Sequence, residues 1–379
     1  MTTTTKKRTR LIATCAAAAL AASLALVLAG CASSAAPASS ASSAAGSAAA
    51  EAQTRTFTDS AGRTVELPAT IERIAPSGHT ANQVLLTMAP EKMVGLSQDL
   101  TPEQAKYFNI DPANMPVFGA AFGAKGDINK EAVAAADPQV IIDTGEYKDG
   151  LKEDLDTLQE QLGIPCVFIE TKLEDYGAAY EDLGELLGME ERGRELSDYC
   201  RAAYDETTSV MATIPESERA NIAYLLGDAG LNAIAANSYQ GGVIDLCANN
   251  LFKPEKATGS GGGQEVSLEQ IALWNPELIV FQKGSIYDTV GDNPAWDGIA
   301  AIDSGNYYEV PGSPYCWLNN PPTVNQVMGM QWLPRLLYPD KFDTSIEDVA
   351  KSYYHTFYGY DLSDEEVAEL TENALPKAA

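Results

Sequence analysis

The chain has few of the residues that carry out chemistry in enzymes and metal sites. Its 379 residues include only two histidines, His79 and His355, and six cysteines, none of them in a C-x-x-C pair. A site for bare zinc or manganese needs several histidines together with carboxylates, so capture of a naked divalent ion is disfavoured. The patterns G-x-S-x-G and H-E-x-x-H are absent, and the glycine run 259–263 lacks the Lys-Ser/Thr pair of a phosphate-binding loop. We therefore predict that the protein is not an enzyme.

Positive charge is scarce as well. The sequence has 25 Lys and Arg residues against 53 Asp and Glu residues, which gives a formal net charge of −28. A body this acidic repels phosphate backbones, so no nucleic-acid partner is expected. Solubility alone is the alternative explanation of the excess.

The N-terminus combines basic residues with an apolar run. Four Lys and Arg residues within positions 6–10 precede the run 11–30, which ends in Leu-Ala-Gly directly before Cys31. This layout is typical of a secretory signal. The last four residues resemble a bacterial lipobox, which implies cleavage before Cys31 and acylation of its sulfur. An uncleaved anchor is the alternative, because about 20 apolar residues can span a bilayer.

Residues 31–54 are almost entirely Ala and Ser and have no apolar periodicity, so they are predicted to form a flexible tether from the lipid anchor. The expected location is extracytoplasmic, on the outer face of the cytoplasmic membrane. Four cysteines follow the tether at widely spaced positions: Cys166, Cys200, Cys247 and Cys316. One or two disulfides and four buried thiols both fit these positions, since pairing cannot be deduced from spacing.

An internal repeat organises the rest of the chain. Residues 128–142 match residues 266–280 at a constant offset of 138. Each copy begins with a polar capping residue, Asn129 or Ser267, and continues as a short helix that ends at an Asp-Pro or Asn-Pro pair. A β-branched apolar run follows, which is typical of a strand buried on both faces. Two copies indicate two similar α/β lobes, although a chance match of a common joint is the alternative.

Other segments extend this pattern. Strands are predicted at 71–76, 93–97, 140–143 and 166–170 in the first half, and at 220–226, 278–282 and 307–310 in the second. Strands that alternate with helical stretches favour mainly parallel sheets. An amphipathic helical region, 173–213, separates the two sets. Capping boxes at Thr344-x-x-Glu347 and Ser363-x-x-Glu366 predict two helices near the C-terminus.

The predicted fold is therefore α/β, with two Rossmann-like lobes of mainly parallel sheet joined by a long helical connector and a ligand cleft between the lobes. The expected parts are a signal peptide, 1–30, a lipid-anchored linker, 31–54, an N-terminal lobe, 55–172, the connecting helix region, 173–213, and a C-terminal lobe with terminal helices, 214–379.

Several segments carry a family resemblance. They are 57–63 with 67–74, the paired repeats, 307–311 followed by 315–317 and 321–325, and 332–338. Together and in this order they resemble the substrate-binding proteins of ABC importers, and within them the helix-hinged class that handles metal complexes. The resemblance implies a monomer without an intrinsic cofactor that captures a metal complex and delivers it to a permease dimer with its ATPase.

The sequence does not identify the ligand. A ferric siderophore or haem leads, with iron the expected metal, and cobalamin, a nickel chelate and an oxyanion such as molybdate are alternatives. Alternatives of another class are a surface lipoprotein enzyme on the same scaffold, such as a chelatase or hydrolase, and an adhesive lipoprotein.

Ligands of two-lobed α/β proteins bind near the carboxyl ends of strands, and that rule selects candidate loops. The loops are 77–79, 118–123 and 144–147 in the first half, and 237–239, 259–264, 283–287 and 315–317 in the second. The candidate ligand-binding residues in these loops are Ser77, His79, Phe122, Tyr147, Tyr239, Lys283, Tyr315 and Trp317.

His79 is the candidate to coordinate a chelated metal, because a neutral imidazole binds iron, nickel and cobalt. A solvated histidine at a helix start is the alternative. The aromatic residues are candidates for walls around a bulky ligand or, alternatively, for core packing. Lys283 is a candidate partner for an anionic group or a solvated lysine.

Glu131 and Glu269 occupy equivalent positions in the two repeats. The resemblance implies that each docks its lobe onto a basic pocket of the permease. Two carboxylates on pseudo-symmetric lobes suit a two-fold partner and steer its association. The alternative is a pair of ordinary first-turn carboxylates that complement the helix dipole.

Overall fold

The structure, a computed structural model, describes residues 53–122, 127–257 and 261–376. The predicted signal peptide, Cys31 and nearly all of the tether lie outside the described residues. Within the described part, no helix combines the length and the apolar character needed to cross a membrane.

The first lobe is built on a parallel three-stranded sheet in the order β3-β4-β5. Its strands are β3 (Ile74–Pro76), β4 (Val140–Gly145) and β5 (Cys166–Glu170), and Ile74 pairs with Val140 while Ile141 pairs with Cys166. An antiparallel hairpin, β1 (Thr54–Thr58) and β2 (Thr64–Pro68), precedes this sheet. The helices of the lobe are α1 (His79–Met88), α2 (Pro102–Ala105), α3 (Lys130–Ala136) and α4 (Leu151–Leu162), with 3-10 turns at Pro90–Lys92 and Pro112–Asn114.

The second lobe has a separate sheet in the order β11-β10-β6-β7-β9, with β8 also paired to β6. Its strands are β6 (Asn221–Leu226), β7 (Asn232–Ala233), β8 (Asn249–Asn250), β9 (Gln264–Glu265), β10 (Leu278–Phe281) and β11 (Tyr307–Glu309). The central pairs, β10 with β6 and β10 with β11, are parallel, whereas β7 is antiparallel to β6 and β9.

The helices of the second half cover this sheet and continue beyond it. They are α7 (Gly242–Cys247), α8 (Leu268–Trp274), α9 (Tyr287–Val290), α10 (Ala300–Asp303), α11 (Asn325–Leu337), α12 (Ile346–Tyr358) and α13 (Asp364–Thr371). This half also contains 3-10 turns at Glu216–Glu218, Tyr239–Gly241, Pro294–Trp296 and Pro339–Lys341.

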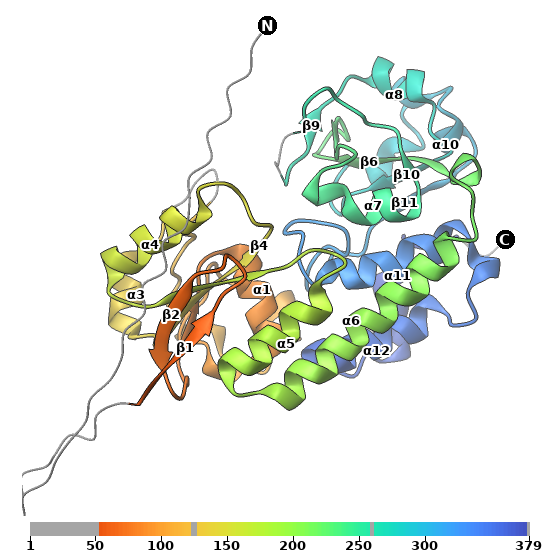
Figure 1. Ribbon diagram of the computed structural model, residues 1–379. Coiled ribbons are helices and arrows are strands. Elements are labelled where there is room, and N and C mark those ends of the chain that lie inside the picture. The colour runs from red at the N-terminus through yellow and green to blue at the C-terminus, as the bar shows by residue number, and fades with distance from the viewer. Residues whose placement is uncertain (1–52, 123–126, 258–260, 377–379) are drawn as a thin grey trace, which may run out of the picture. The chain divides into compact units, whose positions relative to one another are not determined.

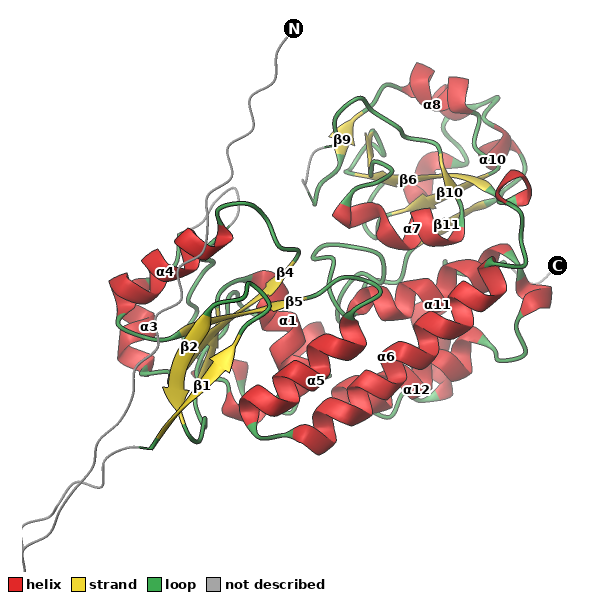
Figure 2. Cartoon of the chain, in the orientation of Figure 1, coloured by secondary structure: helices red, strands yellow, loops and turns green. Residues whose placement is uncertain are grey.

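Two helices connect the lobes, α5 (Tyr176–Leu187) and α6 (Glu190–Met211). They lie side by side with α11 and α12 (Figures 1 and 2), and α12 also packs against α1 of the first lobe. The largest apolar cluster accordingly runs from the first sheet through these helices to one face of the second sheet. Separate clusters fill the other face of each sheet. Both sheets therefore rest on one shared layer of helices.

The repeat predicted from the sequence is present in both lobes. Asn129 caps α3 by accepting a hydrogen bond from the Ala132 N–H at 3.0 Å, and Ser267 caps α8 through the Gln270 N–H at 3.2 Å. The residue before each proline, Asp137 or Asn275, takes a left-handed conformation with φ of 50° or 44° and ends the helix. A buried parallel strand, β4 or β10, then follows in each lobe.

Two details differ from the prediction. Segment 93–97 is not a strand, because its backbone changes partner: the Val94 N–H bonds to Ile74 and the Leu96 N–H to Pro116. The helix predicted to begin with a Thr344 cap is instead capped by Ser345, whose hydroxyl accepts from the Asp348 N–H. The box at Ser363 and Glu366 is confirmed. The four cysteines beyond the tether are buried free thiols.

The crossing of α5 and α6 leaves no room for a side chain. A Cβ atom added to Gly193 would lie 2.5 Å from the Tyr180 carbonyl oxygen and 2.9 Å from the Gly184 Cα. Both of these atoms belong to the backbone, so relief requires the helices to move apart. The glycine is therefore needed here for close helix contact, although alanine is the better helix former.

We predict that Gly193→Ala lowers the free energy of unfolding by about 1–3 kcal/mol, the usual cost of overpacking. Denaturant titration measures this change. Arg194→Ala, at an exposed position one residue away on the same helix, is the matched control and should stay within about 0.5 kcal/mol of the parent. A Gly193→Ala variant as stable as the parent would contradict the close crossing.

Candidate functional site

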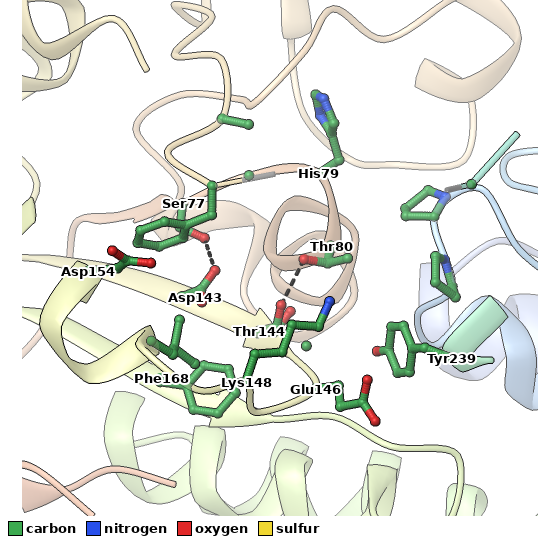
Figure 3. A pocket seen from close by; sticks show the side chains of 18 of the residues that line it. Ser77, His79, Thr80, Asp143, Thr144, Glu146, Lys148, Asp154, Phe168 and Tyr239 are labelled. Atoms are coloured by element: carbon green, nitrogen blue, oxygen red, sulfur yellow. Dashed lines mark hydrogen bonds between the residues drawn. The ribbon is translucent and has the colours of Figure 1, made fainter. Parts of the chain in front are cut away.

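A cavity of about 540 Å³ opens where the ends of β3 and β4 face loops of the second lobe (Figure 3). Its wall in the first lobe includes the residues that follow β3, the end of β4 and part of α4. The second lobe contributes Tyr239, Gln240, Gly261 and the segment 320–322. This is the carboxyl edge of a parallel sheet, where α/β folds commonly bind ligands.

The floor of the cavity carries a buried carboxyl group. Asp143 is 8% exposed and accepts a hydrogen bond from the hydroxyl of Ser77, which is 1% exposed (Figure 3). Burial raises the pKa of Asp143 to about 6, while the Ser77 hydroxyl, the Thr144 N–H and the charge of Arg63 act in the opposite direction. The group is therefore mostly ionised at pH 7 and partly protonated near pH 6.

The first turn of α1 forms the adjoining wall. The Thr80 hydroxyl donates to the Thr144 carbonyl oxygen at 2.7 Å and so ties this turn to the end of β4. Thr144 is 3% exposed, and its own hydroxyl oxygen has no hydrogen-bond partner among the described residues. A buried hydroxyl without a partner is costly, so this oxygen is positioned for a water molecule or a ligand.

His79 lies at the rim rather than on the floor. Its Nδ1 atom is 3.0 Å from the Ser97 hydroxyl, and Figure 3 shows its ring directed away from Asp143. Partial burial lowers the pKa of His79, so the ring is neutral at pH 7. Because the contact with Ser97 uses Nδ1, Nε2 is the atom suited to coordinate a metal.

Tyr239 joins the two lobes beside the cavity. It extends from the 3-10 turn Tyr239–Gly241 of the second lobe, and its hydroxyl donates to the Thr171 carbonyl oxygen at 2.8 Å. Burial raises the pKa of Tyr239 to about 12, so the phenol keeps its proton and acts as the donor. The ring forms one side of the cavity, with Glu146 next to it and Lys148 across from it (Figure 3).

Four of the eight residues predicted to bind the ligand line this cavity: Ser77, His79, Phe122 and Tyr239. Tyr147 lies beside it, half exposed, with its ring 6.4 Å from that of Phe168, which does line the cavity. Lys283 is outside the lining and exposed, and its Nζ atom is 3.9 Å from the Glu103 carboxylate.

The predicted placement of Tyr315 and Trp317 in the cavity wall needs correction. Trp317 is 1% exposed and packs edge-to-face on Trp332 at 6.2 Å, and Tyr315 is 5% exposed, with its ring 6.3 Å from that of Phe108. Large rings gain most when they are fully removed from water, which is the reason they lie in the core here.

The candidate loops missed several lining residues, among them Asp143, Asp154 and Phe168. Asp143 ended the predicted strand 140–143, and a carboxylate at the end of a buried strand was a usable signal. Phe168 lies within β5 and Asp154 on the exposed side of α4, and neither position is distinctive in the sequence.

Glu131 and Glu269 both lie in the first turn of their helices, α3 and α8, and both are exposed. The backbone N–H of Glu269 and the Ser267 hydroxyl lower the pKa of the Glu269 carboxyl group, so it stays ionised at neutral pH. The two positions are equivalent within the repeated units and lie outside the lining of the cavity.

Comparison with known proteins assigns the family. A model of the periplasmic binding protein family matches residues 84–314. The chain belongs to this family. A solved ABC transporter solute binding protein of Sulfurospirillum deleyianum shares 29% identity and a TM-score of 0.78, over 84% of this chain and 99% of that one.

Two further relatives share this fold. The molybdate-binding protein MolA of Haemophilus influenzae is 23% identical over 80% of this chain and 91% of its own length. Helicobacter pylori CeuE is 15% identical with a TM-score of 0.60, over 86% of this chain and all of its own. The family and these neighbours are substrate-binding transport proteins and not enzymes, which removes the alternative of an enzyme on the same scaffold.

The family also confirms the predicted fold of two α/β lobes with a helical connector. This chain is thus an extracytoplasmic binding protein of an ABC importer. Its ligand and the role of each lining residue do not follow from membership of the family, because the same fold holds different ligands.

The buried carboxyl group makes stability depend on pH. The pKa of Asp143 is about 6 in the folded protein, above the usual 3.8, so the folded state binds this proton more tightly than the unfolded chain. Its contribution to stability is therefore greatest below about pH 4, is lost as pH rises toward 6, and stays lost above pH 6.

We predict that Asp143→Asn raises the free energy of unfolding by about 1–3 kcal/mol at pH 8, since two pKa units correspond to roughly 3 kcal/mol. The Ser77 hydroxyl retains an acceptor in the amide oxygen. Urea titrations at pH 8 and pH 5 should show the gain shrink at the lower pH. Asp149→Asn, at the exposed rim, should change neither value, and an equal effect of Asp143→Asn at both pH values would contradict the assigned shift.

Proposed function

We propose that this protein captures a metal complex, with a ferric siderophore or haem leading, and delivers it to the permease dimer of an ABC importer with its ATPase. The observation that carries the proposal is the cavity of about 540 Å³ beside a single histidine. This volume falls in the range of sites for small organic ligands. A bare metal ion or a tetrahedral oxyanion is far smaller, comparable to one or two water molecules of roughly 30 Å³ each.

The side chains able to coordinate a metal favour a metal ion that is already bound to a chelator when it enters the cavity. Among the described residues, His79 is the only histidine or cysteine in the lining, and no group of three or more His, Cys, Asp or Glu side chains is placed to hold a metal ion. A chelate needs few protein ligands because the chelator fills most of the coordination sphere. The solved CeuE structure is described as a complex with nickel and histidine, which fits a receptor for a chelate on this fold.

An oxyanion is the second candidate. It is favoured by the likeness to MolA, whose name gives molybdate as its ligand. Cobalamin and a nickel chelate also remain candidates. With any of these ligands, the protein has no intrinsic cofactor and acts as a monomer, and the metal-containing ligand is its cargo.

The remaining features support delivery at a membrane. Cleavage before Cys31 and acylation of its sulfur anchor the protein to the outer face of the cytoplasmic membrane, and the tether 31–54 lets the folded lobes reach a neighbouring permease. Glu131 and Glu269 dock one lobe each onto the permease dimer. Tyr147, Lys283, Tyr315 and Trp317 contact the ligand only if binding rearranges the lobes.

Ligand identity is tested directly by native mass spectrometry of protein purified from its own host, combined with metal analysis. A bound species that contains a transition metal and its chelator is the expected result. A metal-free metabolite in stoichiometric amount would overturn the metal-complex proposal.

The docking role predicts a separation of uptake from binding. Glu131→Ala combined with Glu269→Ala removes both exposed carboxylates, so ligand uptake by cells should be lost while ligand affinity of the purified protein stays unchanged. Glu153→Ala with Glu160→Ala, two exposed carboxylates on α4 outside the lining, is the control with equal charge change. Lost affinity in the first double variant would show that these residues belong to the ligand site instead.

The metal role of His79 predicts a loss of affinity. Replacing the ring by Ala should weaken binding of a metal complex at least tenfold, about 1.4 kcal/mol, as measured by calorimetric titration. His355→Ala, an exposed histidine of α12 that pairs with Asp361, is the matched control and should leave the titration unchanged. Identical curves for His79→Ala and the parent would remove His79 from the site.

A further inference from the structure

The charged side chains of the cavity are mostly of one sign. Four carboxylates, Asp143, Glu146, Asp149 and Asp154, line it together with one lysine, Lys148. Figure 3 shows Asp154 on one side of the Ser77–Asp143 pair and Glu146 on the other. No arginine is among the described residues of the lining. The described lining is therefore negative by about three charges near neutral pH.

Arg63 exerts a field on Asp143, but it is engaged elsewhere. Its guanidinium bonds to Asp59 at 2.8 Å, to Asp156 at 2.8 Å and to the Cys166 carbonyl oxygen at 2.6 Å, and it does not line the cavity. A ligand could recruit this group only at the cost of these charge-assisted bonds.

Three of the four hydroxyl groups in the described lining point to the same conclusion independently of charge. The Thr144 hydroxyl is the exception, because it has no partner among the described residues and its proton is free. The Ser77 hydroxyl donates a hydrogen bond to the Asp143 carboxylate, the Thr80 hydroxyl donates to the Thr144 carbonyl oxygen, and the Tyr239 hydroxyl donates to the Thr171 carbonyl oxygen. Each hydroxyl has only one proton, so these three offer a ligand acceptor lone pairs and no donor. An anion needs donors around it, whereas ammonium, amide and hydroxyl groups need acceptors.

The N-terminus of α1 is the feature that opposes this preference. Its first turn lines the cavity and contributes partial positive charge equivalent to about half an elementary charge. That is smaller than the net negative charge of the side chains. Lys148 is already included in that net value. The described part of the lining therefore attracts cations and repels anions.

From the charge and the use of the donors we infer that the cavity takes a neutral or positively charged metal complex and discriminates against anionic ones. The inference rests on the proposed function and narrows it. Hydroxamate-type ferric complexes, corrinoids and uncharged nickel chelates fit such a lining. Haem with its two carboxylates, ferric tris-catecholates and molybdate do not.

A charge series on one chelator tests the inference. Ferric desferrioxamine B has a terminal ammonium group, its N-acetyl derivative ends in a neutral amide, and its N-succinyl derivative ends in a carboxylate, while the iron-hydroxamate core stays the same. Calorimetric titration of the purified protein should give the tightest binding for the ammonium form and at least tenfold weaker binding for the carboxylate form. Raising the salt concentration should reduce the difference, because the rim carboxylates are exposed.

Neutralising the lining shows whether these carboxylates cause the preference. In the variant Glu146→Gln, Asp149→Asn and Asp154→Asn, the affinities for the three complexes should differ by less than about threefold.

The control variant makes the same change in net charge away from the cavity. It carries Glu66→Gln, Glu153→Gln and Glu160→Gln at exposed positions outside the lining, and it should keep the full preference. If the control loses the preference to the same extent, the effect belongs to the whole protein and the inference fails.

Titrations with haemin, molybdate and cyanocobalamin complete the panel of probes. They distinguish a failure of the charge preference from a failure of the proposed receptor function. Binding of haemin or molybdate at least as tight as that of the neutral and cationic probes overturns the charge inference and leaves the receptor function intact. Tighter binding of the succinyl complex than of the ammonium complex also overturns the charge inference and leaves the receptor function intact. If none of the six probes binds, the proposed capture of a metal complex fails, and the inference fails with it.

Discussion

The position of the two lobes depends on close packing within the layer of helices that they share. Gly184 and Gly193 allow the backbones of α5 and α6 to touch, and α6 in turn packs on α11 and α12. Helix α12 reaches back to α1, which packs on β3 and β4 of the first sheet. Because one apolar cluster runs through all of these helices, the joint between the lobes is a packed core rather than a pair of flexible strands. Large relative motion would break that core, which favours limited closure on a ligand.

The cavity lies above this layer and is kept polar by the way the strands end. Strand β3 is buried throughout and β4 is buried up to Thr144. A polar residue lies near the carboxyl end of each strand, Ser77 directly after β3 and Asp143 in the second half of β4. The two side chains bond to each other, so the carboxylate keeps a partner after losing most of its water. Burial still disfavours the charged carboxylate and raises the pKa of Asp143, and raised pKa values of this kind occur often at functional sites. Tyr239 then joins the opposite lobe to this edge through Thr171.

The duplicated helix–strand unit explains how one chain presents two equivalent faces. In each copy a polar cap fixes the helix start, a left-handed residue before proline ends it, and a parallel strand enters the sheet. The exposed glutamate therefore occupies the same position in the first turn of each helix. A carboxylate in a first turn also complements the helix dipole, so the same residue suits both local stability and a two-fold partner.

Local patterns were sufficient to predict the repeat, the caps at Asn129, Ser267 and Ser363, and most buried strands, because each depends on residues only a few positions apart. They also located the loops that carry Ser77, His79 and Tyr239. They misplaced Trp317 and Tyr315, since a cavity wall and a protein core select the same large aromatic residues. Asp154 and Phe168 join the cavity only because α4 packs against β5, which pairs with β4. Which side chains share a cavity, and which donors are already used within it, was decided by tertiary contacts between residues far apart in the chain.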